Sequence, residues 1–298
     1  MNANIIDGKL IAQKIKDEIK IKILDLKEKP GLAVILVGED DASKIYVKNK
    51  EKDCNEIGFY SEVYKLNENT SNGELINLIK DLNNSDKIHG IIVQLPLPEH
   101  IKEEVVINTI SPEKDVDGFT YINAGKLFTG NNGLRPCTPA GCIELIKSTG
   151  NEIKGKDAVI VGRSNIVGKP MAMMLMQEHA TITVCHSKTR NLSEITKKAD
   201  ILVAAIGKAK MITADMVKEG SIIIDVGMNK DENGKLCGDV DFENVKEKVA
   251  FITPVPGGVG PMTRAMLMKN TLHAYLLKKN GGNSLWKIKL FIPGLLIQ

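Results

Sequence analysis

Hydrophobic and polar positions along the first 110 residues predict alternating helices and strands. Apolar residues at Ile11, Ile15 and Ile19 keep a helical spacing, and Pro30-Gly31 ends that helix before LAVILVG, a run typical of a strand buried on both faces. Further helices are predicted at 43–57, after Ser71 and at 99–110, and further strands in FYSEVYKL and GIIVQLPL. This succession implies a parallel sheet.

The same alternation restarts after a turn-rich stretch, 111–139. Five apolar runs predict strands of a second parallel sheet that begins near residue 155: DAVIVG, TITVCH, ILVAAIG, SIIIDVG and VAFITPVP. A long helix follows from Pro261 to about Lys279, with proline in the first turn, where its fixed φ is suitable. We therefore predict two domains with a boundary near residue 137. The apolar tail, 285–298, is too short to span a membrane and is expected to pack on the protein or on a partner subunit.

Length, charge and cysteine content narrow the class of protein. A chain of 298 residues exceeds the size at which one core stays efficient, which favours two domains. The net charge of +3 is spread along the chain, so nucleic acid is not an expected partner. The sequence shows neither a signal peptide nor a membrane span, which predicts a cytoplasmic protein. Five widely spaced cysteines without metal-ligand spacing indicate buried free thiols and no metal site.

The segment VGRSNIVGKP, residues 161–170, lies between a predicted strand and a predicted helix, as a dinucleotide-binding loop does. Gly162 permits a tight turn, Ser164 is small and adds a hydroxyl donor, and Gly168 permits close packing of helix and strand. The helix N-terminus would offer free N–H groups to phosphate. Glycines in such a turn also have a purely steric explanation, so the loop alone is weak evidence.

The end of the next strand favours NADP over NAD. An NAD site normally carries an acidic residue there, whereas this strand ends in TVCHSKTR, with Ser187, Lys188 and Arg190. Hydroxyls and cations suit a 2′-phosphate, and Arg163 would add a planar fork of donors. Lys188 and Arg190 can equally be solvated turn residues.

Three segments of the first half point to a site. SKIYVKNK places Ser43, Tyr46 and Lys50 on one side of a helix, and VQLPLP puts Gln94 at the carboxyl end of a buried strand, where parallel sheets form their ligand crevice. EKDVDG adds Asp115 and Asp117 in a loop. Each has a structural alternative: a solvated lysine, an amide that satisfies backbone groups, and turn-forming acids.

Seven motifs together resemble the bifunctional methylenetetrahydrofolate dehydrogenase/cyclohydrolase family, in order and separation, from about residue 4 to residue 280: SKIYVKNK, VQLPLP, PEKDVDGF, RPCTPAG, GRSNIVGKPM, DVGMN and PVPGGVGPMT. The resemblance implies an α/β fold of two Rossmann-like parallel-sheet domains flanking a cleft, with the C-terminal helix returning to the first domain. Residues 1–136, completed by 268–298, would form the folate-binding catalytic domain, and 137–267 the NADP-binding Rossmann domain. A homodimer through the nucleotide domain is also implied.

The resemblance also implies roles for individual residues. Lys50 corresponds to the catalytic lysine, Tyr46 to a tyrosine packed beside the folate, Gln94 to a glutamine that hydrogen-bonds the lysine, and Asp117 to the carboxylate that binds the pterin. The implied NADP contacts are Gly162, Arg163, Ser164, Ser187 and Met228. The implied folate contacts further include Leu95, Pro256, Gly257 and Gly258, the last three in a loop, Pro256 to Thr263, that closes over both ligands. Arg264 stands where the resemblance leads us to expect a small apolar residue.

The implied chemistry is oxidation of methylenetetrahydrofolate with NADP⁺ and hydrolysis of the methenyl product to 10-formyltetrahydrofolate. One alternative is another NADP-dependent two-domain dehydrogenase, of the shikimate or amino-acid type. A second is a nucleotide-binding protein without catalytic activity. The joint presence of Tyr46, Lys50, Gln94 and Asp117 argues against the second alternative, because binding alone does not require the lysine.

Overall fold

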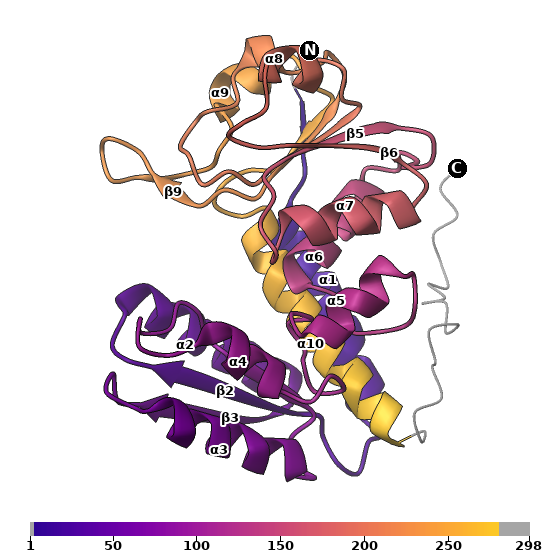
Figure 1. Cartoon of the computed structure of the whole chain (residues 1–298). Helices are drawn as coiled ribbons and strands as arrows, with labels where there is room; N and C mark the ends of the chain where they lie inside the picture. Colours follow the sequence, from indigo (N-terminus) through magenta and orange to yellow (C-terminus); the bar gives the residue numbers. More distant parts are fainter. Residues whose placement is uncertain (1–2, 280–298) are drawn as a thin grey trace.

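The computed structural model describes residues 3–279, which form two parallel sheets joined by a layer of helices (Figure 1). The predicted α/β fold with two parallel-sheet domains is confirmed. Residues 280–298, which include the apolar tail and the end of the segment expected to complete the first domain, lie outside the described residues.

The first sheet has the order β3-β2-β4, so that β2 lies between its two neighbours. All seven residues of β2 are buried, and they alternate between two faces. Ala33 and Ile35 pack in a core with the inner faces of α3 and α4, while Leu32 and Val34 face the helices at the centre of the molecule. The elements are β2 (Gly31–Val37), α2 (Asp41–Ile57), β3 (Tyr60–Leu66), α3 (Asn72–Asn84), β4 (Gly90–Val93) and α4 (Glu103–Thr109).

The second sheet has six parallel strands in the order β1-β11-β8-β7-β5-β6. Its strands are β1 (Asn4–Ile5), β5 (Asp157–Val161), β6 (Thr181–Cys185), β7 (Ile201–Ala204), β8 (Ile222–Asp225) and β11 (Phe251–Ile252). Because β1 pairs with β11, Asn4 and Ile5 form part of this sheet, whereas the predicted boundaries assign them to the first domain. A strand of two residues carries no hydrophobic period that a sequence could reveal.

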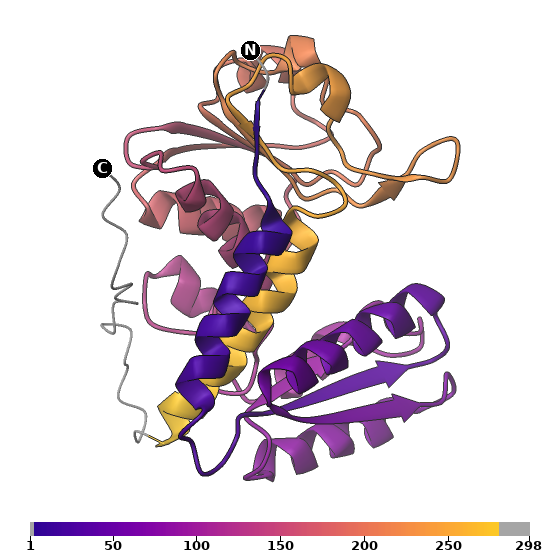
Figure 2. The same cartoon turned by 180° about the vertical axis from the view of Figure 1, so that it is seen from behind.

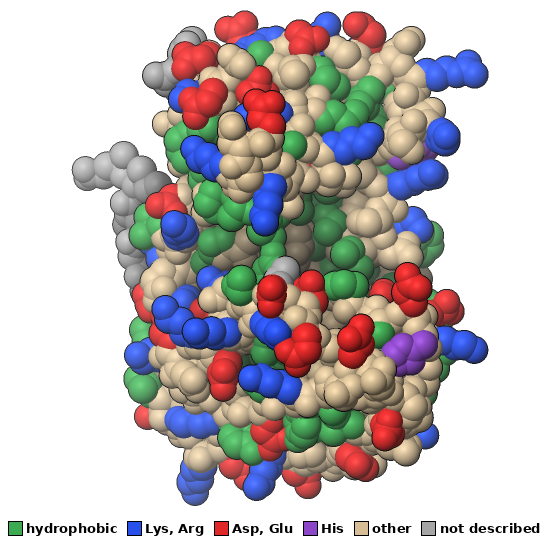
Figure 3. Space-filling model, turned by 90° about the vertical axis from the view of Figure 1, so that its left-hand side faces the viewer, with side chains coloured by type: hydrophobic (Ala, Val, Ile, Leu, Met, Phe, Trp, Pro, Cys, Tyr) green, Lys and Arg blue, Asp and Glu red, His purple; other side chains and the backbone are tan. Residues whose placement is uncertain are grey.

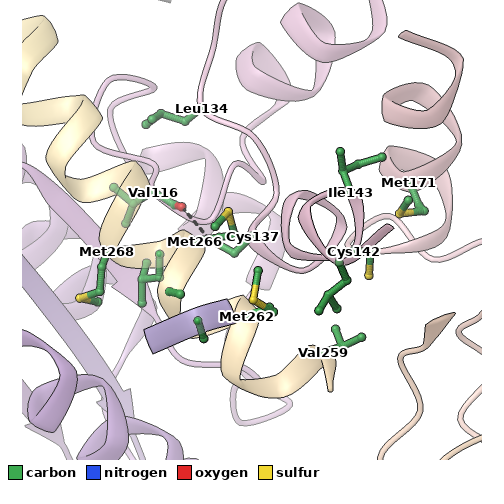
Figure 4. Close-up of a cluster of buried hydrophobic side chains, with 14 of the residues drawn as sticks. Val116, Leu134, Cys137, Cys142, Ile143, Met171, Val259, Met262, Met266 and Met268 are labelled. Carbon is green, nitrogen blue, oxygen red and sulfur yellow. Dashed lines mark hydrogen bonds between the residues drawn. The ribbon is translucent and has the colours of Figure 1, made fainter. Parts of the chain in front are cut away.

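Helices α1 (Gly8–Ile23), α6 (Cys137–Ser148) and α10 (Val259–Lys279) form the layer between the sheets. Helix α10 lies along both α1 and α6 and also contacts α2 and β4, so the C-terminal helix does return to the first domain (Figure 2). Sulfur-containing side chains from α6 and α10 fill the contact, with Met262 and Cys142 fully buried (Figure 4). Such polarizable side chains adapt well to irregular gaps.

Turn signals concealed two helices of the stretch 111–139. Helix α5 (Tyr121–Phe128) leaves Tyr121, Ile122 and Phe128 exposed and buries Asn123, so its apolar positions do not mark its buried face. Helix α6 begins inside RPCTPAG, where Pro139 occupies a first-turn position that needs no N–H donor. The helix predicted at 99–110 is shorter in the structure, since α4 begins at Glu103.

The remaining elements of the second half are short. They are α7 (Gly168–Gln177), α8 (Leu192–Thr196), β9 (Asn229–Lys230), β10 (Leu236–Cys237) and α9 (Phe242–Val245).

All five cysteines are free thiols, as predicted. Four of them are buried, and Cys237 is partly exposed. Within residues 3–279, no helix combines the length and the apolar character needed to cross a lipid bilayer.

Candidate active site

A hollow lined by hydrophobic side chains separates the two halves of the molecule (Figure 3). Helix α2 and the loop after β4 border it on the first half, and the loop after β8 borders it on the second. The Tyr46 hydroxyl reaches across this hollow and donates to the Met228 sulfur at 3.2 Å. Two of the sequence-predicted residues, one from each half, therefore meet across the cleft.

Lys50 and Gln94 form a direct hydrogen bond at the floor of the first half. The Lys50 Nζ donates to Gln94 Oε1 at 3.0 Å, and the lysine is partly buried. Gln94 is itself held, since its backbone N–H donates to the Ile35 carbonyl and its Nε2 donates to the Leu95 carbonyl at 2.7 Å. The amide oxygen is thus oriented toward the amine, and it can align Lys50 without neutralising it.

The two acids of EKDVDG differ in their surroundings. Asp115 is buried, and its carboxylate accepts from Phe119 N, Thr120 N and Asn123 Nδ2 at 2.8 to 3.1 Å, so it organises the loop. Burial raises the pKa of Asp117, whereas the positive charge of Lys50 opposes that shift. The Asp117 carboxyl therefore lies close enough to Lys50 to feel its positive charge. A carboxylate in this position can accept hydrogen bonds from N–H donors of a ligand.

Helix α2 presents Tyr46 and Lys50 together because its start is fixed. Asp40 caps the helix by accepting from Ser43 N at 2.7 Å. Ser43 is buried below the cleft, while Tyr46 and Lys50, one and two turns further on, are partly exposed. Desolvation raises the pKa of Tyr46, so its hydroxyl stays protonated and can donate at neutral pH.

The glycine loop of the second half is packed so closely that no side chain fits at two of its positions. Gly162 has φ +138°, and a Cβ there would lie 2.2 Å from the Ala205 carbonyl oxygen. A Cβ at Gly168 would lie 2.2 Å from the Gly162 oxygen. Ser164 Oγ accepts from Val167 N and Gly168 N at 3.2 and 3.3 Å, so it shapes the loop while its proton remains available for donation. The loop follows β5, where the strand order reverses, the position at which open parallel sheets bind ligands.

The segment after β6 lies beside this loop. Val161 and Cys185 are register partners, and Gly162 N donates to the Cys185 carbonyl at 2.9 Å. Arg163 and Ser187, which follow these two strands, are both exposed. A guanidinium and a hydroxyl are therefore exposed at the carboxyl ends of two adjacent strands, β5 and β6.

The connection from β11 to α10 carries Pro256, Gly257 and Gly258. Gly258 packs against Gly8 at the start of α1 so closely that a Cβ on Gly8 would lie 1.9 Å from the Gly258 oxygen. Gly257 has φ +111°, a backbone conformation that glycine tolerates best. The first turn of α1 therefore fixes the loop predicted to close over the ligands.

Arg264 finds a partner that the sequence did not suggest. Its Nη1 lies 3.0 Å from Asp53 Oδ2, off the hydrogen-bond direction, so the contact is chiefly electrostatic. Asp53 is almost fully buried on α2, one turn after Lys50, and its other oxygen lies 3.3 Å from Lys16 Nζ. The ion pair connects the start of α10 to the helix that carries Lys50.

Sequence reasoning missed Asp53 and also two buried acids at the edge of the second sheet, Asp225 and Asp239. Asp53 could have been found because it lies three residues after Lys50, on the same face of the helix. Asp225 and Asp239 could have been found because they stand in two similar segments, DVG and GDV.

Two family models match the chain: the tetrahydrofolate dehydrogenase/cyclohydrolase catalytic domain at residues 6–117 and the NAD(P)-binding domain of the same family at residues 136–279. The chain is 56% identical to the bifunctional protein FolD of Moorella thermoacetica over 277 residues, which cover 92% of this chain and 99% of that protein.

Solved structures agree. The crystal structure of the bifunctional enzyme FolD from Campylobacter jejuni superposes with a TM-score of 0.91 at 51% identity, covering 93% of this chain and 99% of that one. The Trypanosoma brucei methylenetetrahydrofolate dehydrogenase-cyclohydrolase, complexed with NADP cofactor and inhibitor, superposes with a TM-score of 0.89 at 36% identity, covering 95% and 100%. Shikimate dehydrogenase from Thermus thermophilus, at 14% identity and a TM-score of 0.51, shares only the fold.

The Arg264–Asp53 pair is expected to stabilise the fold. Arg264→Ala would leave a buried carboxylate with Lys16 alone, and we expect a loss of about 2 kcal/mol in the free energy of unfolding, less than for a fully buried pair because Arg264 is partly exposed. Urea denaturation of Arg264→Ala, Asp53→Ala and the double variant measures the coupling. Strictly additive losses would show that the two side chains do not interact.

Proposed function

This chain belongs to the tetrahydrofolate dehydrogenase/cyclohydrolase family, and we propose that its cleft carries out both reactions of that family at one site. It is a bifunctional enzyme of one-carbon folate metabolism, a methylenetetrahydrofolate dehydrogenase and methenyltetrahydrofolate cyclohydrolase. The observation that carries the assignment of the site is the hydrogen bond from Lys50 to Gln94 beside Asp117.

The proposed folate site uses the first half of the cleft. Asp117, ionised, would accept from the amino and ring N–H donors of the pterin, and a site built on such donors rejects analogues that lack them. Tyr46 would pack against the folate, and Leu95, Pro256, Gly257 and Gly258 would line its remaining contacts. These residues align the bridging carbon with the cofactor, which is most of what the oxidation asks of the protein.

The proposed cofactor is NADP. When bound, its oxidised nicotinamide accepts the hydride that leaves the methylene carbon. The residues present fit the group, because Gly162 and Gly168 let the loop pack tightly at the end of β5, and the exposed side chains of Arg163, Ser164 and Ser187 offer guanidinium and hydroxyl donors to phosphate. Arg163 and Ser187 would hold the 2′-phosphate, and Met228 would contact the nicotinamide end.

Hydrolysis of the methenyl product assigns proton transfer to Lys50. The neutral amine would remove a proton from water as the oxygen bonds to the methenyl carbon. The resulting ammonium would then give its proton to the ring nitrogen as the bond from that nitrogen to the carbon breaks, while the hydroxyl of the adduct releases its proton to solvent and becomes the formyl oxygen. Gln94 would keep the Lys50 amine directed at one carbon.

We also propose the division of these roles between residues 1–136, completed by 268–298, and residues 137–267. The family models support a division near residue 136, although the nucleotide model continues through α10 to residue 279. The packing of α10 against α1, α2 and β4 is what favours its assignment to the first domain.

A homodimer through the nucleotide domain is the proposed assembly. Exposed apolar side chains lie on two neighbouring elements of this domain, Met176 on α7 and Val184 on the edge strand β6, and Phe128 is exposed on α5, a helix of the first domain that contacts α7. We expect a dimer in sedimentation equilibrium and a shift to monomer for Val184→Lys. A wild-type protein that sediments as a monomer at micromolar concentration would contradict the proposal.

Lys50→Met tests the lysine directly. Loss of the proton-transfer group should slow methenyltetrahydrofolate hydrolysis by about 10²-fold or more, while NADP binding stays unchanged. The decay of methenyl absorbance measures hydrolysis, and Lys48→Met, on the exposed side of the same helix, is the matched control. Full hydrolysis by Lys50→Met would refute the role of the lysine.

Arg163→Ala tests the choice of cofactor. Removing a charge-assisted contact to the 2′-phosphate should raise the KM for NADP by roughly tenfold or more and change the KM for NAD little. Initial rates with each cofactor measure the ratio, and Lys154→Ala, an exposed residue that precedes β5 at the other end of the same sheet, is the control. An unchanged ratio would remove the reason for assigning the phosphate to Arg163.

A further inference from the structure

Two buried carboxylates tie together the loops at the carboxyl edge of the second sheet. Asp239 is fully buried, and its carboxylate accepts from three successive backbone N–H groups that follow β7, those of Ile206, Gly207 and Lys208, at 2.6, 3.1 and 2.8 Å. It also accepts from Asn229 Nδ2 at 2.9 Å. One side chain therefore fixes both the loop after β7 and the residue that follows Met228.

Asp225, the last residue of β8, completes the arrangement. Its carboxylate accepts from Gly227 N, Asp239 N and Val240 N at 2.9 to 3.0 Å. Asp239, whose side chain fixes the two loops, is thus itself fixed by the hydrogen bond from its backbone N–H to Asp225. With seven hydrogen bonds between them, both carboxylates face the protein and not the cleft.

The glycines of DVG and GDV make this packing possible. A Cβ on Gly227 would lie 2.4 Å from the Asp239 carboxyl carbon, and a Cβ on Gly238 would lie 1.8 Å from Asp225 Oδ2. Both contacts are too short for any side chain. The two segments, eleven residues apart in the sequence, are therefore one structural unit.

We propose that Asp225 and Asp239 are positioning residues for the nicotinamide half of the cofactor. The inference rests on the proposed function, which places that half beside Met228. The loops after β7 and β8 lie next to the glycine loop after β5, in the crevice of the sheet, and Met228 also receives the Tyr46 hydroxyl. Holding these loops before the cofactor binds avoids the entropy of ordering them at that moment.

Asp239 is the better residue for a test. Burial raises the pKa of Asp225 to about 7, so its charge varies in the range of an assay. Asp239→Asn keeps the shape of the side chain but replaces one acceptor oxygen by a donor that faces backbone N–H groups.

A comparison of the NADP-dependent oxidation with the cofactor-independent hydrolysis distinguishes a loss of cofactor positioning from a general loss of folded structure. For Asp239→Asn we expect the KM for NADP, and the dissociation constant of NADPH from its fluorescence, to rise roughly tenfold or more. Methenyltetrahydrofolate hydrolysis, which consumes no cofactor, should stay within about twofold of wild type. Asp200→Asn is the matched control, because Asp200 also accepts a backbone N–H, from Asp157 at 3.0 Å, but at the opposite edge of the same sheet.

Asn229→Ala is the second variant and removes only the side-chain bond to Asp239, so it keeps the inference testable if Asp239→Asn does not fold. We expect it to raise the KM for NADP severalfold without loss of hydrolysis. An unchanged KM for NADP in the folded variants, or an equal fall in both activities, would overturn the inference while wild type still binds NADP. A wild-type enzyme that does not bind NADP would instead overturn the proposed function.

Discussion

The packing of α10 between α1 and α6 is the contact on which the rest of the structure depends, because it sets the distance between the two sheets. Without it, the ligand-binding edges of the two sheets would have no fixed relation. The buried methionines and cysteines of this contact adapt to three helices at once. The ion pair between Arg264 and Asp53 adds a polar link at the end of the helix nearest the cleft.

Some aspartates near the active site hold the backbone in place, and another is available to bind a ligand. Asp115 and Asp117 stand two residues apart in one loop, but backbone and amide donors occupy the first, while the second lies in the field of Lys50. Asp225 and Asp239 resemble Asp115, since their carboxylate oxygens accept hydrogen bonds from backbone N–H groups. An acid in a motif of this fold therefore has no fixed role, and the number of N–H donors around it decides what it can do.

The sequence was most informative where signals were local. The strands buried on both faces, such as β2 and β8, are continuous aliphatic runs, and the spacing of Tyr46 and Lys50 placed them on one face of α2. The pairing of Lys50 with Gln94 was available only through the family resemblance, because 44 residues separate them. Arg264 and Asp53, or β1 and β11, are partners over more than 200 residues, and no periodicity links such positions. Helix α5 was missed for a different reason, since most of its apolar side chains are exposed and Leu127 is the buried exception.

The path of the chain has a consequence for how such an enzyme can change over generations. The backbone begins in the nucleotide sheet with β1, crosses to the other half in α1, returns at α6 and crosses again in α10. Neither half is therefore a contiguous stretch of gene. Exchange of residues 137–267 alone would leave β1 of the old chain to pair with the new sheet, whereas substitutions at places such as Arg163 and Ser187 leave that pairing untouched.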